Sequence, residues 1–255
     1  MGLGLIGATR MAELGRARRK SNTEPMRHQD PGGTRRDILE VASREFARNG
    51  LSGARVDEIA AHTRSSKRMI YYYFGDKEGL YLRVLEDAYR LVREGEAKLD
   101  VEGLSPIEAL RQLVEFTFDH HRQHEEFIRL VMIENIHGAE YLNQSDVVRG
   151  LNASAIDHVT RIYESGVAGG DFRPGIDPVE LHWLISSLCF FNVSNRATFS
   201  RIFGRDFGSD EMQDRLRRNA VDTVLRFAVV SEAGAPELPA ANKPLVATAT
   251  SGRSR

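Results

Sequence analysis

Residues 54–80 read ARVDEIAAHTRSSKRMIYYYFGDKEGL, and this stretch decides the fold of the front of the chain. Apolar residues recur at helical spacing over 56–62, which predicts a short helix with one inward face. A tight connection is expected over 63–65. A second short helix is expected over 66–74, because Ser66 is a preferred N-cap residue. Two short helices joined by a tight turn are typical of a helix-turn-helix, which places its second helix in the major groove of DNA.

The side chains of the second helix suit contact with a nucleic acid. Lys67 and Arg68 stand at its N-terminal end, from which they can reach base edges. The three tyrosines at 71–73 carry phenol groups that can donate to phosphate oxygens. Lys77 opens the next helix, where a cation and free backbone N–H groups together form an anion site. From the residues alone, DNA binding and plain packing of an aromatic helical hairpin both remain open.

A resemblance to a known family favours DNA binding. The matching motifs are Val56-Asp57-Glu58-Ile59-Ala60, Ser66-Lys67, Ile70-Tyr71-Tyr72-Tyr73-Phe74 and Asp76-Lys77-Glu78-Gly79-Leu80. At this density and spacing they resemble the DNA-binding domain of the TetR family of bacterial regulators. The clear match covers residues 34–90, and beyond it the resemblance is one of architecture.

The resemblance implies a set of DNA-binding residues. Base reading is implied for Ser66, Lys67 and Arg68, and backbone contact for Tyr71, Tyr73, Lys77 and Arg55. This sequence departs from the family pattern at three positions. Arg64 replaces the usual turn glycine, so it is expected to adopt a conformation that glycine adopts more cheaply, and it could equally be an added phosphate contact. Ser65 replaces the apolar residue that follows, and Ala54 replaces the usual threonine N-cap, so that cap needs another acceptor or water.

The rest of the chain is expected to be helical. Helices are predicted over 34–49, 76–91, from Ser105 onward, and over 125–137, 147–167, 178–197 and 209–230. Ser105-Pro106-Ile107-Glu108 is a strong helix start, with serine as N-cap and proline at the first position. No segment shows sustained period-two alternation with turn residues, so the fold class is all-α. The expected domains are a disordered arm (1–33), a three-helix helix-turn-helix domain (34–80), a helical ligand-binding and dimerisation domain (81–232) and a disordered tail (233–255).

Charge is distributed unevenly. Residues 1–80 hold 15 Lys and Arg against 10 Asp and Glu, although the whole chain has a net charge of −1. A basic front fits a polyanionic partner. The basic run 16–20 either adds phosphate contacts or is a solvated leader. One cysteine, Cys189, excludes an intrachain disulfide, and no apolar run reaches the ~20 residues of a membrane helix, so we expect a cytoplasmic protein without a membrane partner.

The rear domain is expected, from the resemblance, to bind a small molecule and to dimerise. The predicted helix over 178–197 is apolar on more than one face, which fits burial against a second subunit. The last helix carries an apolar stripe that would pair with the helix over 178–197 across the two-fold axis. The stripe consists of Val221, Val224, Leu225 and Ala228. Residues expected to line a ligand pocket are Phe118, His121, Phe127, Asn135 and Trp183. Core packing is the competing explanation for each.

The leading hypothesis is a homodimeric repressor that binds double-stranded DNA and releases a near-palindromic operator when a small-molecule effector binds. Effector and DNA would then be negatively coupled. We expect no enzyme activity, no catalytic residues and no cofactor. A metal-dependent enzyme built on His120, His121 and His124 is one alternative, although clustered helical histidines are more often surface or hydrogen-bonded groups. A constitutive architectural DNA-binding protein without an effector is another.

Overall fold

The computed structural model describes residues 31–101 and 103–230. Its helices are α1 (Pro31–Gly53), α2 (Val56–His62), α3 (Lys67–Phe74), α4 (Lys77–Glu96), α5 (Pro106–Gln123), α6 (Glu125–Ile136), the 3-10 helix η1 (Leu142–Gln144), α7 (Asp146–Gly169), α8 (Pro178–Ser194), α9 (Arg196–Phe203) and α10 (Asp210–Ala228). Within these ranges β pairing is limited to one isolated bridge between Phe172 and Val229. The expected all-α class is confirmed.

The structure describes only a small part of the expected N-terminal arm (1–33) and none of the expected C-terminal tail (233–255). Helix α1 begins at Pro31, earlier than the expected start at Thr34, so residues 31–33 are helical. The remainder of the expected arm, and the whole tail at 233–255, lie outside the described residues. Over the described ranges, each helix is too short or too polar to cross a lipid bilayer.

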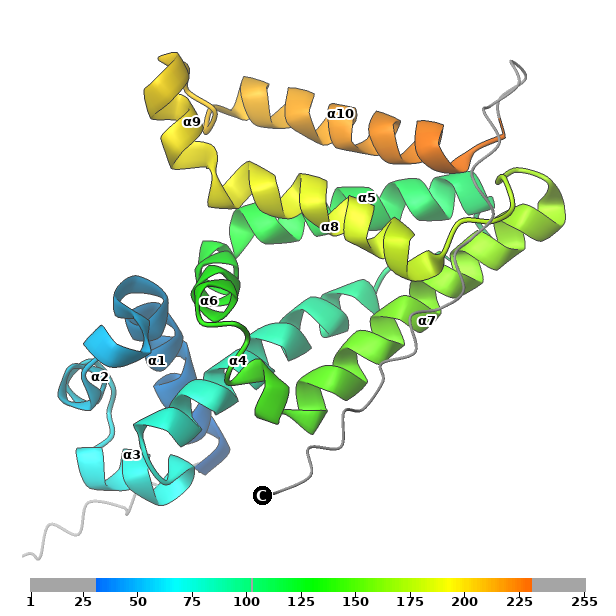
Figure 1. The fold of residues 1–255 in the computed structure, drawn as a ribbon. Helices are drawn as coiled ribbons and strands as arrows, with labels where there is room; N and C mark the ends of the chain where they lie inside the picture. Colours follow the sequence, from blue (N-terminus) through cyan, green and yellow to red (C-terminus); the bar gives the residue numbers. More distant parts are fainter. Residues whose placement is uncertain (1–30, 102, 231–255) are drawn as a thin grey trace, which may run out of the picture.

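The front of the molecule is a small head formed by α1, α2, α3 and the first half of α4 (Figure 1). Its core consists of side chains that the helical spacing turns inward, among them Ile38, Phe46, Ile59, Ile70, Leu80, Tyr81 and Val84. The rings of Phe46 and Tyr81 meet edge to face with centroids 5.1 Å apart. The chain turns at Gly50, where φ is 67°, at the Asn49-Gly50 stop that the sequence predicts.

The rear of the molecule has a second core. Figure 1 shows α5, α8 and α10 running side by side above α7; α5, α8 and α10 contact one another, and α7 contacts α5 and α8. Helix α5 starts as predicted, with the Ser105 hydroxyl accepting from the Glu108 amide at 3.2 Å. The buried residues of this core include Leu110, Val114, Phe118, Leu181, Ile185, Cys189, Val221 and Val224. Burial of an aliphatic or aromatic side chain contributes about 1.5–3 kcal/mol, so each core stabilises its own end of the molecule.

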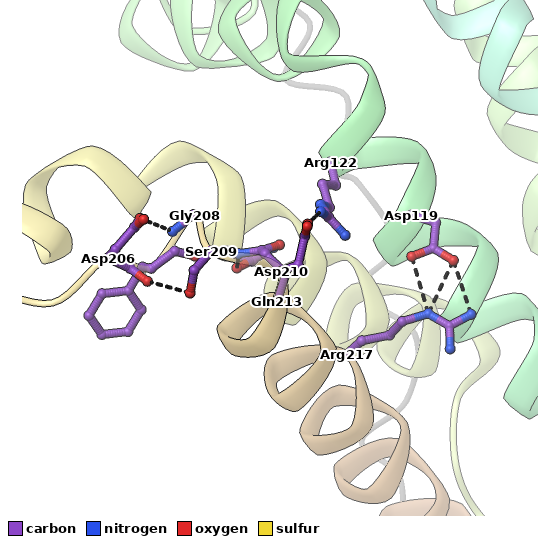
Figure 2. Close-up of polar contacts among 10 residues, drawn as sticks. Asp119, Arg122, Asp206, Gly208, Ser209, Asp210, Gln213 and Arg217 are labelled. Carbon is purple, nitrogen blue, oxygen red and sulfur yellow. Dashed lines mark hydrogen bonds and ion pairs between the residues drawn. The ribbon is translucent and has the colours of Figure 1, made fainter.

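Polar contacts fasten the start of α10 to its neighbours. Figure 2 shows the Arg217 guanidinium facing the Asp119 carboxylate of α5, with Nη2 3.0 Å from Oδ2, and Arg122 paired with Asp210. Gln213 is fully buried and exchanges two hydrogen bonds with Asn192 of α8, at 2.9 and 3.0 Å. It also donates to the Phe207 carbonyl at 2.7 Å. These bonds fix the register of α10 against α5 and α8.

Two expectations about the rear helices were wrong. The predicted helix over 178–197 ends at Ser194, and a separate helix, α9, follows from Arg196. Asn195 between them has φ −107° and ψ 0°, and its carbonyl accepts from the Thr198 hydroxyl, which starts the new helix. The stripe on α10 faces the core of its own subunit, because Val221, Val224, Leu225 and Ala228 are all buried there.

Candidate nucleic-acid interface and internal cavity

Helices α2 and α3 form the expected helix-turn-helix. Ile59 of α2 and Ile70 of α3 are fully buried and hold the two helices together. The Ser66 hydroxyl accepts from the Met69 amide at 3.2 Å and caps α3, so this hydroxyl is already engaged. Lys67, Arg68 and Tyr71 are exposed on the outer side of α3. A row of cationic and phenolic groups on an outward helix can contact both base edges and phosphates.

The turn between α2 and α3 does not use the conformation expected of Arg64. Among the non-glycine residues that the structure describes, only Ala139 has a positive φ. Side chains hold the turn instead, because the Thr63 hydroxyl accepts from the Ser65 amide at 3.3 Å and the Arg64 amide donates to Asp37 at 3.2 Å. The Arg64 side chain is exposed.

The start of α2 also differs from the expectation. Its N-cap residue is Arg55, and Ala54 is buried just before it. The Arg55 amide donates to the Glu45 carboxylate of α1 at 3.1 Å. Its carbonyl accepts from the amides of Glu58 and Ile59 at 3.0 and 3.2 Å. The Arg55 side chain stays exposed, as a backbone contact requires.

Lys67 is tied to α2 by an ion pair. Its Nζ lies 2.9 Å from Oδ1 of Asp57, and the hydrogen bond to Asp57 raises the pKa of Lys67. Both side chains are about half exposed, so solvent screens the pair and its strength is modest. DNA phosphates or base acceptors can therefore compete with Asp57 for this ammonium group.

The three tyrosines of α3 are not equivalent. Tyr72 is 78% exposed and Tyr71 39%, whereas Tyr73 is half-buried against the core of the head. The Tyr73 ring also packs edge to face on Tyr72, with centroids 5.4 Å apart. Tyr72 is therefore an exposed phenol that the resemblance passed over, since the family pattern treats its position as variable. Helical spacing places it on the outer face and could have identified it.

Lys77 and the start of α4 form a different arrangement from the expected anion site. The Asp76 side chain accepts from the Gly79 amide at 2.7 Å and occupies one of the backbone donors on which the expectation relied. Lys77 donates to the Ser52 carbonyl at 3.2 Å and so bridges α4 to the end of α1. The cation is still available at the surface, but Asp76 places a negative charge beside it.

One further cation lies near α3. The Arg35 guanidinium at the start of α1 lies 5.6 Å from the centre of the Phe74 ring. This contact holds Arg35 beside the C-terminal end of α3. Sequence reasoning missed it because Arg35 and Phe74 are distant in sequence and only the fold brings them together.

Behind the head lies a cavity of about 540 Å³. It is lined by Tyr89, Arg93, His121, Phe127, Val131, Asn135, Asn152, His182, Trp183, Ser186, Ser187, Phe190, Phe191, Ser194 and Asn195. Four of the five expected pocket residues line it together. The fifth, Phe118, is almost fully buried and lies instead at a separate groove between α8, α9 and α10.

Histidines gather beside this cavity. The rings of His120 and His124 stack with centroids 4.1 Å apart, and His124 pairs with the His120 carbonyl at 2.9 Å. Burial lowers the pKa of His120 to about 4, so its ring is neutral at pH 7. Among the described residues there is no group of three or more His, Cys, Asp or Glu side chains that could hold a metal ion.

Two helices belong to both the head and the cavity. Helix α4 supplies Tyr81 and Val84 to the core of the head, and Tyr89 and Arg93 to the cavity. Helix α6 places Leu130 against the head core and lines the cavity with neighbouring residues. A shift of α4 or α6 at the cavity therefore also moves side chains that pack in the core of the head.

A buried hydrogen bond joins these two helices. The Tyr81 phenol donates to Oε1 of Glu134 at 2.9 Å, and the other carboxylate oxygen accepts from the amides of Tyr141 and Leu142. Both Tyr81 and Glu134 are almost fully buried. Burial and this hydrogen bond raise the pKa of Tyr81, so its phenol remains a donor.

Comparisons with known proteins agree with this architecture. Residues 38–84 match the family model for bacterial regulatory proteins of the tetR family, and residues 106–224 match a tetracyclin repressor-like C-terminal domain. The HTH-type transcriptional repressor NicS of Pseudomonas putida is 37% identical over 186 residues, which are 73% of this chain and 88% of that protein. The HTH-type transcriptional repressor SCO4008 of Streptomyces coelicolor is 36% identical over 202 residues, covering 76% and 97%. The crystal structure of SCO4942 from Streptomyces coelicolor superposes with a TM-score of 0.60 at 27% identity, covering 76% and 98%.

Proposed function

This chain belongs to the TetR family of bacterial regulatory proteins, and from that premise we propose that it is a homodimeric repressor that a small molecule releases from DNA. It is a helix-turn-helix transcriptional regulator, and the relatives described above are named repressors. We expect it to act in the cytoplasm and to catalyse no reaction.

The proposed DNA contacts follow the geometry of α3. Lys67 and Arg68 read base edges in the major groove, while Ser66 acts mainly as the cap that aims them. Tyr71, Lys77 and Arg55 contact the backbone, joined by Tyr72 and Arg35. Tyr73 contributes chiefly by packing against the head core. In a two-fold dimer, half-sites would lie about 34–36 Å apart on a near-palindrome.

Apolar side chains left exposed on α8 and α9 support the homodimer. Val179, Trp183 and Phe191 of α8, with Ile202 and Phe203 of α9, are exposed in the single chain. Large apolar side chains exposed to water favour coverage by a partner, and a second copy supplies one symmetrically.

One observation carries the release mechanism: α4 and α6 each line the cavity and pack in the head core. An effector that fits the cavity only when these helices shift would move the heads out of register with the two grooves. The effector and the operator then oppose each other by a single coupling free energy.

The test measures binding of the purified protein to its own upstream DNA and to a scrambled duplex at physiological salt. We expect saturation at one dimer, or two, per near-palindromic site, with little binding to the scrambled duplex. Equal affinity for both duplexes would contradict the proposal.

A further inference from the structure

The cavity behind the head carries one fixed charge. Arg93 is the cation among its lining side chains, and none of the described residues that line it is acidic. Arg93 pairs with Glu96, which does not line the cavity, through Nη1 and Oε2 at 2.5 Å. This pair leaves Nε of Arg93 buried, with no hydrogen-bond partner within the described part of the chain. Glu96 therefore satisfies the Arg93 guanidinium incompletely, and an anionic acceptor beside this group would form a strong charge-assisted hydrogen bond.

The other titratable groups of the cavity add no charge at pH 7. Burial, together with the positive charge of Arg93, lowers the pKa of His121 to about 3 and that of His182 to about 4. Nδ1 of His121 is also buried without a partner among the residues described. Arg93 is therefore the one charged group among the described residues that line the cavity, and Glu96 partly balances its charge.

The walls of the cavity suit a flat ring. Tyr89 and Phe127 meet edge to face with centroids 5.2 Å apart, and Phe190, Phe191 and Trp183 contribute further aromatic surface. Aromatic side chains pack favourably on flat rings in stacked or edge-on geometry. The volume of about 540 Å³ lies within the range of small-molecule sites.

We propose that the effector of this regulator is a small ring compound that carries one carboxylate. The ring lies among the aromatic walls, and the carboxylate pairs with the guanidinium group of Arg93 and accepts from neighbouring side-chain donors such as Asn135. This inference rests on the proposed function, because it takes the cavity to be the effector site.

Matched pairs of compounds test the carboxylate. The probes are benzoate, 2-naphthoate and cyclohexanecarboxylate, each beside its primary amide, with hexanoate as an open-chain acid. Calorimetric titration of the full-length protein without DNA gives the affinities, and the rise in melting temperature checks them. We expect at least one ring acid to bind about tenfold or more tightly than its amide, and more tightly than hexanoate.

Variants on α4 assign that preference to Arg93. Glu96→Gln removes the counter-charge and should strengthen acid binding, whereas adding Arg93→Gln to it should abolish the preference for acid over amide. Arg90→Gln is the matched control, because Arg90 lies on the same helix and pairs with Asp87 outside the cavity. It should leave the preference unchanged. The melting temperature of each variant without ligand shows whether it folds.

Three outcomes would overturn the inference: no ring acid binding at millimolar concentration, amides binding as tightly as acids, or a preference that survives in the Arg93→Gln and Glu96→Gln double variant. Failure of the proposed function would show separately, as loss of operator preference in the absence of any compound.

Discussion

At the scale of single residues, some side chains of α3 are proposed to contact base edges, whereas others cap the helix or pack it against the head. Replacing Lys67 or Arg68 with alanine should cost about 1–3 kcal/mol of operator binding and relax the preference at one base position. Lys67→Ala also leaves Asp57 unpaired near the DNA, so Lys67→Ala with Asp57→Asn should recover affinity for all duplexes but not the base preference. Titration against operators with single base changes measures both effects. An unchanged preference profile would remove Lys67 and Arg68 from the reading role.

Replacing Lys77 tests the proposed contacts to the DNA backbone through the affinity for different duplexes and its dependence on salt. Lys77→Ala should weaken binding to every duplex alike and reduce the slope of log K against log salt by about one charge, because the side chain meets phosphate rather than a base. Arg215→Ala on α10, far along the chain from the head, serves as a control and should leave the slope unchanged. A Lys77→Ala protein that favours a different operator would contradict this assignment.

At the scale of elements, the bond between α4 and α6 couples head and cavity. Tyr81→Phe removes the phenol donor and leaves Glu134 with two amide partners, which should cost about 1–3 kcal/mol of unfolding free energy. A double-mutant cycle with Glu134→Gln, read by urea unfolding, should give a non-additive coupling energy. Thr117→Val offers a matched control, because its buried hydroxyl bonds only within α5. Additive effects at Tyr81 and Glu134 would mean that the bond does not connect the helices.

The helix starts show what the sequence could predict. Ser66 and Ser105 are side-chain N-caps in the structure as predicted, because a cap is a local bond between residues three apart. The break at Asn195 was missed, because apolar residues continue on both sides of it. The turn at Arg64 was misjudged for a related reason: its stabilising partner, Asp37, comes from α1 and is distant in sequence.

The candidate sites also divide into residues placed by local sequence, which could be predicted, and residues brought together from distant parts of the chain, which could not. Motif spacing predicted the outer face of α3, since one short helix determines it. The cavity residues were only partly predictable, because helices distant in sequence assemble the cavity. The helical spacing of Phe118 fits a pocket residue and a core residue equally well, and the structure places Phe118 in the core. Neither Tyr89 nor Arg93 was identified, because the pocket was expected among helices later in the chain and the predicted helix over 76–91 ends before Arg93.

At the scale of the whole molecule, buried histidines make stability depend on pH. Burial lowers the pKa of His121 to about 3 and the pKa values of His120 and His182 to about 4, whereas an unfolded histidine titrates near pH 6.5. Between these values the unfolded chain binds more protons than the folded chain, so stability is complete above about pH 6.5 and falls as the pH is lowered. Each fully shifted histidine should cost about 2 kcal/mol between pH 7 and pH 5.

Urea unfolding at pH 7 and pH 5 measures this loss, and a window above pH 5 limits the contribution of carboxylates. His121→Gln should remove roughly 2 kcal/mol of the difference between the two pH values, since the variant has one neutral buried group fewer to protonate on unfolding. His62→Gln on the exposed surface of α2 should leave the difference unchanged. A His121→Gln protein with the full pH dependence would show that protons enter the rear core without unfolding it, and the cavity would then be open to water and to protonated ligands at pH 5.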